Sequence, residues 1–144
     1  QVQNGERPKA LVIGNEAILR GDLTPEQLGG YLRALKATTG LPVTTAEPWH
    51  VWLKNPELAD SVDFITIHLL PYWEGIAADV AVDAAFRHLQ QVRERFPGKP
   101  VVVGEVGWPS LGDRYLDAVA NPANQARFIR DWIVRAEAQG IEYY

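Results

Sequence analysis

Short apolar segments of strand length alternate along this chain with longer amphipathic segments of helical period. The apolar runs fall at residues 10–14, 42–46, 62–68 and 100–105, and a fifth begins at residue 141. They are almost continuously hydrophobic, as strands of a buried parallel sheet are, whereas half-solvated antiparallel strands would alternate. The sequence therefore predicts an α/β fold built on a parallel sheet.

The helical segments carry start and stop signals. Thr24 and Gln27 have the spacing of a capping box, with a proline at the first helical position, and Gly40 is placed to end that helix. Asn121 followed by proline repeats the start signal. Two helical faces are expected to lie on the sheet, formed by Val82, Phe86, Leu89, Val92 and Phe96 and by Ala126, Ile129, Ile133 and Ala136.

Doubly wound sheets and (β/α) barrels both produce this alternation. The glycine-rich phosphate loops GxGxxG and GxxxxGK[ST], which mark nucleotide-binding doubly wound folds, are absent. A complete barrel needs about 250 residues. We therefore expect residues 1–144 to form a partial catalytic (β/α)8 TIM barrel domain, about strands four to eight, with the N-terminal strands missing.

The composition excludes several classes of function. The chain has a net charge of −4 and no run of Lys or Arg interleaved with aromatic residues, so nucleic acid is not expected as a partner. There is no cysteine, which excludes disulfides and thiol catalysis but leaves the cellular compartment open. The longest apolar stretches fall far short of the ~20 residues of a membrane-spanning helix.

Two glutamates occupy matching places in the predicted sheet. Glu16 follows the first apolar run in the segment LVIGNE, and Glu105 ends the fourth in the segment VVVGE. Barrel enzymes hold their active sites at the carboxyl ends of the strands, and a carboxylate beside a buried strand is costly unless it has a partner. Either acid alone could simply bond a helix N-terminus, but two facing acids are what glycoside hydrolysis needs.

The segments GNE at 14–16 and GEVGWPS at 104–110 resemble the two catalytic segments of glycoside hydrolase family 17, the β-1,3-glucanases and glucanosyltransferases. The resemblance implies a retaining reaction on β-1,3-linked glucan through a covalent glycosyl-enzyme, with transfer of the glucosyl unit to a sugar or to water. It implies Glu16 as acid/base, Glu105 as nucleophile and Asn15 as a donor to the sugar 2-hydroxyl. It implies no cofactor.

The segment IHLLPYW at 67–73 departs from the Asn-x-Tyr-Pro pattern of the plant members and resembles the bacterial branch of the family. Members of that branch are often attached to membrane glucan synthases. The resemblance therefore implies fusion or attachment to a membrane glycosyltransferase in the full-length protein. It also implies a periplasmic, extracytoplasmic or membrane-associated location, determined by segments outside this sequence.

Six further side chains follow predicted strands at the same mouth and are candidates for binding a sugar. They are Glu47, Trp49, His68, Tyr72, Trp73 and Trp108. Flat aromatic faces can stack on pyranose rings, His68 could bond Glu105 or the sugar, and Glu47 could bond substrate or tune a catalytic carboxyl. The simpler interpretations are packing for the aromatic residues, a structural histidine and a solvated loop acid.

Other functions remain open. One is a non-catalytic carbohydrate-binding barrel fragment, which keeps the aromatic residues but lacks strands that catalysis needs. Another is an unrelated Schiff-base barrel enzyme, which is disfavoured because the lysines lie outside the predicted strand ends. No metal site is predicted, since His50 and His88 have no partner at metal-ligand spacing and there is no HExxH motif.

Overall fold

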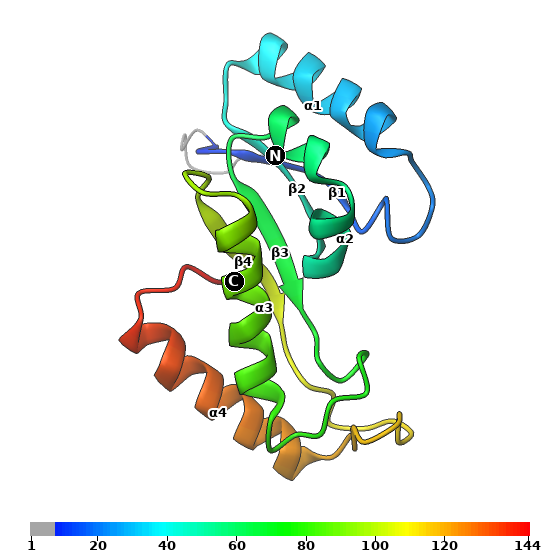
Figure 1. Cartoon of the computed structure of the whole chain (residues 1–144), viewed down its shortest axis with the longest axis vertical. Helices are drawn as coiled ribbons and strands as arrows, with labels where there is room; N and C mark the ends of the chain where they lie inside the picture. Colours follow the sequence, from blue (N-terminus) through cyan, green and yellow to red (C-terminus); the bar gives the residue numbers. More distant parts are fainter. Residues whose placement is uncertain (1–7) are drawn as a thin grey trace.

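The computed structural model describes residues 8–144 and is centred on a parallel sheet. Within this range the strands are β1 (Leu11–Asn15), β2 (Val43–Pro48), β3 (Ile65–Leu69) and β4 (Val101–Val106), in the order β1-β2-β3-β4 (Figure 1). Each strand is parallel to its neighbours, as the continuous apolar runs predicted. Of the expected fifth strand, the described residues show a bridge between Val103 and Tyr143.

Helices follow the strands and cover one face of the sheet. They are α1 (Pro25–Thr39), α2 (Trp49–Lys54), the 3-10 helix η1 (Pro56–Ser61), α3 (Ala81–Arg95) and α4 (Pro122–Ala138). The predicted strand and helix alternation is therefore confirmed. The connection from β2 to β3 is folded into α2 and η1. No helix within residues 8–144 combines the length and hydrophobicity that crossing a bilayer requires.

The helix starts and stops are confirmed. The Thr24 hydroxyl accepts the backbone N–H of Gln27 at 3.3 Å, and the Gln27 side-chain oxygen accepts the backbone N–H of Thr24 at 2.9 Å. Gly40 ends α1 in the left-handed conformation, with φ of 67°. The Asn121 side chain caps α4 by accepting the backbone N–H of Asn124 at 2.8 Å. Each signal works because it satisfies backbone groups that the helix itself leaves unpaired.

One of the two predicted helix faces is correct, and the other is correct only at Ile133 and Ala136, since Ala126 and Ile129 are exposed. In α3 the expected apolar side chains pack into the core, with Val82 at its margin. In α4 the buried side chains are Phe128, Trp132 and Ala136, whereas Ile129 is 42% exposed. The rings of Trp132 and Phe86 lie 4.8 Å apart, so the larger aromatic side chains take the sheet side of α4 and turn Ile129 outward.

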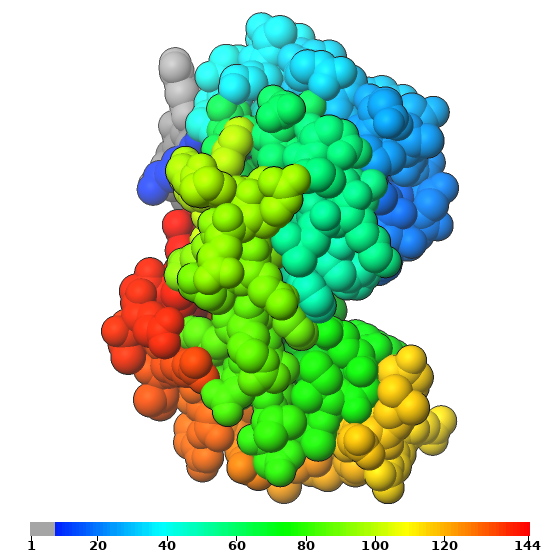
Figure 2. Space-filling model, viewed as in Figure 1, coloured from blue at the N-terminus to red at the C-terminus, as the bar shows by residue number. Residues whose placement is uncertain are grey.

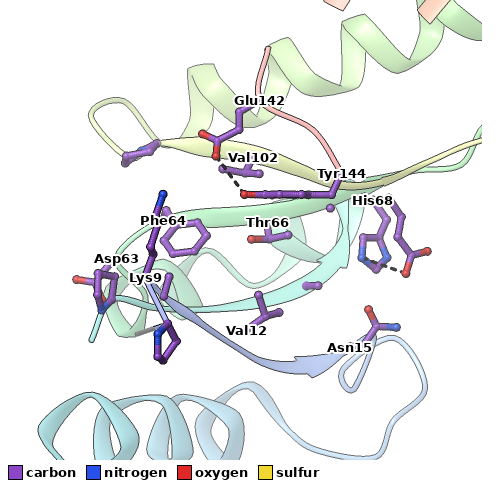
Figure 3. A pocket seen from close by; sticks show the side chains of 17 residues that line it. Lys9, Val12, Asn15, Asp63, Phe64, Thr66, His68, Val102, Glu142 and Tyr144 are labelled. Atoms are coloured by element: carbon purple, nitrogen blue, oxygen red, sulfur yellow. Dashed lines mark hydrogen bonds and ion pairs between the residues drawn. The ribbon is translucent and has the colours of Figure 1, made fainter. Parts of the chain in front are cut away.

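The other face of the sheet is open and bounds a cavity of about 840 Å³, here called the sheet cavity. Among the described residues its lining comes from the strands and their flanking segments, and no helical residue contributes. Val12, Thr66 and Val102 line it from β1, β3 and β4, and Asn15 and His68 lie near one end (Figure 3). In a closed barrel this face would point into the interior.

Candidate active site

In β4 an extra residue enters the strand just before Glu105. Consecutive residues of β3, at positions 67 and 68, pair with Val103 and Glu105, which leaves Gly104 as the added residue. A β-bulge of this kind re-aims the side chain that follows it. Gly104 and Glu105 consequently both line the sheet cavity, although successive residues of a regular strand point to opposite faces.

β1 has a similar irregularity just before Glu16. The pairing advances from residue 12 to residue 15 in β1 while it advances only from residue 44 to residue 46 in β2. Gly14 has a left-handed backbone there, with φ of 84°, and so does Glu16, with φ of 54°. The backbone N–H of Glu16 donates to the carbonyl of Ala46 at 2.8 Å. Each glutamate of the predicted pair therefore follows a distorted strand end that contains a glycine.

His68, at the end of β3, lies between the two glutamates. Its Nδ1 is 2.8 Å from Glu16 Oε1, and its Nε2 is 3.8 Å from Glu105 Oε1. Carboxylate oxygens of both glutamates and a His68 nitrogen lie within 4.8 Å of one another. The Glu16 side chain is 22% exposed and that of Glu105 is 50% exposed. The structure thus brings both predicted carboxylates to one cluster, and the hydrogen bond of His68 is made to Glu16.

The cluster of Glu16, His68 and Glu105 also has the donor types that divalent metal ions accept. The two nitrogens of His68 face different glutamates, and Nδ1 is already within hydrogen-bond distance of Glu16. One nitrogen of His68 is thus already occupied by a carboxylate of the cluster. That the protein needs no metal ion stays a prediction.

Glu47, predicted to contact substrate, lies beneath the loop that follows β1. It is fully buried, and its Oε1 and Oε2 accept the backbone N–H groups of Ile18 at 2.8 Å and Leu19 at 3.2 Å. Burial raises the pKa of this carboxyl, and the two N–H donors partly oppose that shift. A carboxylate without exposed surface cannot meet a sugar or behave as a solvated loop acid. Burial therefore contradicts both the substrate contact and the solvated loop acid, whereas the tuning of a catalytic carboxyl stays an untested prediction.

A cleft of about 400 Å³, here called the rim cleft, opens at the carboxyl ends of the strands. Its lining residues are Glu16, Leu19, Pro48, Trp49, His50, His68, Leu70, Trp73 and Glu74. Trp73 is 69% exposed and therefore has ring surface available to a ligand. Trp49 is partly buried, with its Nε1 donating to Glu74 Oε1 at 3.2 Å. Two of the predicted sugar-binding aromatic residues thus share a cleft with Glu16 and His68.

Glu74 and His88 support this cleft, and neither of them was predicted to have a role in binding. The ring of His88 stacks on that of Trp49 at 3.8 Å, and its Nδ1 lies 3.6 Å from Glu74 Oε2. Burial lowers the pKa of His88 to about 4 and raises the pKa of Glu74. Glu74 adjoins the exposed Trp73 in the sequence, which is the signal that could have indicated it.

Tyr72 and Trp108, also predicted to contact substrate, are buried beneath the loop that follows β4. The Tyr72 hydroxyl and Trp108 Nε1 donate to carbonyls of that loop, and the two rings meet edge to face at 5.6 Å. In Figure 2 this gold loop lies beside the green loop after β3, to which it is joined by a hydrogen bond from Asp117 N–H to the Gly75 carbonyl. Their positions fit loop packing, the simpler of the two interpretations.

Asn15 is exposed at the end of the sheet cavity, near His68 (Figure 3). Its backbone carbonyl accepts a hydrogen bond from Arg20 Nη1 at 2.6 Å, and Arg20 also pairs with Asp22 at 2.7 Å. The Asn15 side chain is therefore placed beside the cluster, and Arg20 tightens the turn that follows. The role of Arg20 could not be predicted from the sequence, because an exposed Arg in a loop has no distinctive spacing.

Comparison with known proteins decides the family. Residues 3–144 match the model of the BtgE/BtgC glycoside hydrolase domain. The chain belongs to this glycoside hydrolase family. It is 35% identical over 123 residues to the probable family 17 glucosidase SCW4 of Saccharomyces cerevisiae and 33% identical over 121 residues to the cell surface mannoprotein MP65 of Candida albicans. Each match covers 78% of the chain, and the chain spans 31% and 32% of those relatives.

Two crystal structures of one fungal protein are similar to this member of the family. One is the family 17 β-1,3-glucanosyltransferase of Rhizomucor miehei, with a TM-score of 0.83 and 34% identity. The other is an active-site mutant of that protein with laminaritriose, with a TM-score of 0.84 and 33% identity. Each match covers 94% of this chain and 51% of the neighbour. The predicted family 17 relationship and partial TIM barrel are confirmed.

The prediction of the bacterial branch is wrong, because the relatives and the structural neighbour named here are fungal. The bacterial branch was predicted only because the segment at 67–73 differs from the plant pattern. Attachment to a membrane glycosyltransferase was inferred from the bacterial branch, so it loses that support and stays an untested prediction.

Proposed function

We propose that the protein containing this chain is a retaining β-1,3-glucan glycosidase and transglycosylase, with residues 1–144 forming part of its catalytic barrel. The observation that carries the proposal is the closeness of the two glutamates: one carboxylate oxygen of Glu16 lies within 4.8 Å of one carboxylate oxygen of Glu105. Retaining enzymes hold their two carboxyl groups about 5–5.5 Å apart, whereas inverting enzymes need about 6.5–9.5 Å to admit a water molecule. The short separation supports retention.

In this mechanism Glu105 attacks the anomeric carbon while Glu16 gives a proton to the departing glycosidic oxygen. The bond from the anomeric carbon to that oxygen breaks, and an ester to Glu105 forms. Glu16 then removes a proton from water or from an acceptor sugar hydroxyl, which attacks the same carbon and releases Glu105. The half-exposed Glu105 carboxylate and the hydrogen-bonded Glu16 suit these two roles.

The remaining proposed contacts come from the rim cleft and from Asn15. Trp73 and Trp49 would present ring faces to pyranose units, and the exposed Asn15 amide would bond the sugar 2-hydroxyl. β-1,3-Glucan as the substrate is supported by the Rhizomucor β-1,3-glucanosyltransferase, an active-site mutant of which forms a complex with laminaritriose. An extracytoplasmic location is supported by the relative described as a cell surface mannoprotein.

The two glutamate roles are tested by replacing each in the complete natural protein. Glu105→Ala should lower turnover of every substrate by roughly 10⁴–10⁶-fold, because no covalent intermediate can form. Glu16→Ala should lower turnover of an oligosaccharide by about 10²–10⁴-fold. With an aryl glucoside whose leaving group needs no proton, the Glu16→Ala variant should still form the glycosyl-enzyme. Azide should then restore its turnover and yield a β-glycosyl azide.

The stereochemistry of the azide product provides the control. In Glu105→Ala, azide should enter from the side that the nucleophile has vacated and give the α product. Identical azide products from the two variants, or unchanged activity in both, would refute the assignment. Binding of laminaritriose by the natural protein without any cleavage or transfer would favour the alternative of a non-catalytic carbohydrate-binding barrel.

A further inference from the structure

The buried carboxylate of Glu47 has no part in the mechanism described above. It is 0% exposed at the end of β2, and both of its oxygens accept backbone N–H groups from the loop that follows β1. Burying an ionisable carboxyl costs free energy unless strong hydrogen bonds compensate. Here the compensation comes from two consecutive N–H groups, at Ile18 and Leu19. Glu47 is therefore committed to the backbone immediately after Glu16.

The backbone at Glu16 needs such support. Its φ of 54° lies in the left-handed region, which is unfavourable for a residue with a side chain and persists only where neighbouring structure enforces it. On one side the N–H of Glu16 donates to Ala46, and on the other its carbonyl accepts the N–H of Arg20 at 2.9 Å. Ala46 and Glu47 are consecutive residues of β2. This strand therefore accepts hydrogen bonds both from the N–H of Glu16 and from the N–H groups that follow it in the turn.

The same turn fixes where the Glu16 carboxylate can reach. Glu16 Oε1 meets His68 Nδ1 at 2.8 Å, and His68 belongs to β3 on the far side of β2. The carboxylate must therefore extend across β2, and a change in the backbone angle at residue 16 would move it away from His68. A displacement of about 1 Å can cost an enzyme 10²-fold in rate.

We propose that Glu47 is a positioning residue for Glu16: by holding the N–H groups of residues 18 and 19 it fixes the left-handed turn that aims the acid/base. This inference rests on the proposed function, since it gives Glu16 a proton to deliver. Glu47 touches neither substrate nor the reacting atoms. Its effect should therefore appear only in steps that need proton transfer by Glu16.

The test is Glu47→Gln in the complete natural protein. Glutamine keeps the size of the side chain but offers one acceptor oxygen in place of two, so one N–H of the turn is left facing an amide NH₂. For laminaritriose, kcat/KM should fall by about 10–100-fold. For an aryl glucoside whose leaving group needs no proton, kcat/KM should change by less than about threefold, because its first step does not depend on Glu16. This selective loss would not follow from a general loss of folded protein.

Asp63→Asn is the matched control. Asp63 Oδ2 accepts the backbone N–H of Val43 at 2.9 Å, so it is also a carboxylate that holds a backbone N–H group, but at the end of β2 opposite to Glu47. This variant should lower stability while leaving the ratio of the two activities unchanged. Glu47→Asp, which keeps the charge but is one methylene shorter, should show the same selective loss as Glu47→Gln.

Equal losses on both substrates, or no loss in either Glu47 variant, would overturn the proposal. Failure of both variants to fold would also overturn it, because Glu47 would then act on the whole fold rather than on one turn. The Glu16→Ala variant is assayed beside them. If it too shows no selective loss on laminaritriose, the role of Glu16 fails and with it the proposed function, whereas selective loss in Glu16→Ala alone rejects only the role of Glu47.

Discussion

The ends of β1 and β4 carry similar sequences, Gly-Asn-Glu and Gly-Glu, yet each needs its glycine for a different physical reason. Gly14 has a φ of 84°, which side chains disfavour, but a Cβ added there would meet its nearest atom, Thr45 Oγ1, at an acceptable 3.4 Å. Gly104 is outside the left-handed region, but an added Cβ would lie 2.5 Å from Thr66 Cγ2. One glycine supplies a backbone conformation and the other supplies space.

The two glutamates differ in a corresponding way. Glu16 is gripped by its turn and by His68, whereas Glu105 lies 3.8 Å from His68 and its side chain is half exposed toward the sheet cavity. The position of Glu16 at the end of β1 is thus set by contacts within the described chain. The β4 end owes its geometry to the close approach of two strands. Substitutions at the two glycines should therefore fail in different ways.

The largest effect on stability is expected for Gly104→Ala. The added methyl would overlap Thr66 Cγ2, so β4 must move away from β3 where Glu105 pairs with His68. Overpacking of this kind costs about 1–3 kcal/mol of unfolding free energy, and we expect the upper half of that range. Chemical denaturation would measure the loss, and activity should fall with it because Glu105 is displaced.

Thr66→Ser provides the control for Gly104→Ala. It removes the Cγ2 methyl but keeps the hydroxyl, which donates to Thr44 Oγ1 at 3.3 Å. The double variant should recover most of the stability that Gly104→Ala loses, so the two changes should be strongly non-additive. Additive free energies in this pair would show that space beside Thr66 is not why residue 104 is a glycine.

A smaller loss is expected for Gly14→Ala. The left-handed backbone should cost alanine about 1–2 kcal/mol, with no steric overlap to add to it. Gly14→Asn should cost less than Gly14→Ala, because asparagine tolerates this backbone region better. Denaturation curves of the two variants would show which of them is the more stable. An asparagine variant that is less stable than the alanine variant would indicate that space, and not φ, is the constraint at residue 14.

The sequence predicted the strands, the capping of α1 and α4 and the pairing of Glu16 with Glu105, because each depends on local pattern. Periodicity failed in α4, where two interleaved apolar rows were available and only packing against Phe86 selects the one with Phe128 and Trp132. The β-bulges also could not be predicted from the sequence. A glycine before a glutamate does not reveal whether it supplies a positive φ or room for a neighbouring side chain.

The same limit applies to the predicted substrate contacts. A residue at a strand end can face the mouth or the interior, and the sequence alone does not distinguish these directions. Glu47 and Tyr72 follow strands as Trp73 does, but Glu47 bonds two N–H groups beneath the turn and Tyr72 lies under the loop after β4. Both outcomes depend on loops whose course is set by distant contacts.

The smallest effects concern the helices that follow the two strand ends. In the capping box of α1 the Thr24 hydroxyl accepts the backbone N–H of Gln27 at 3.3 Å, and the Gln27 side chain accepts the backbone N–H of Thr24 at 2.9 Å. Thr24→Ala therefore removes only the longer of these two hydrogen bonds. In α4, Asn121→Ala removes the 2.8 Å bond that caps the helix. We expect losses of about 0.5 kcal/mol for Thr24→Ala and about 1 kcal/mol for Asn121→Ala.

The double variant Thr24→Ala/Gln27→Ala tests whether the reciprocal bond explains this difference. Gln27 is exposed, so its truncation should cost little beyond the lost cap, and the double variant should match Asn121→Ala at about 1 kcal/mol. Urea denaturation with a common slope for all variants would resolve differences of this size. If Thr24→Ala alone already costs as much as the double variant, Gln27 contributes nothing once the hydroxyl is gone. The N-terminal caps of α1 and α4 would then contribute equally to stability. The only remaining difference between the β1–α1 and β4–α4 units would be the reason for which each needs its glycine.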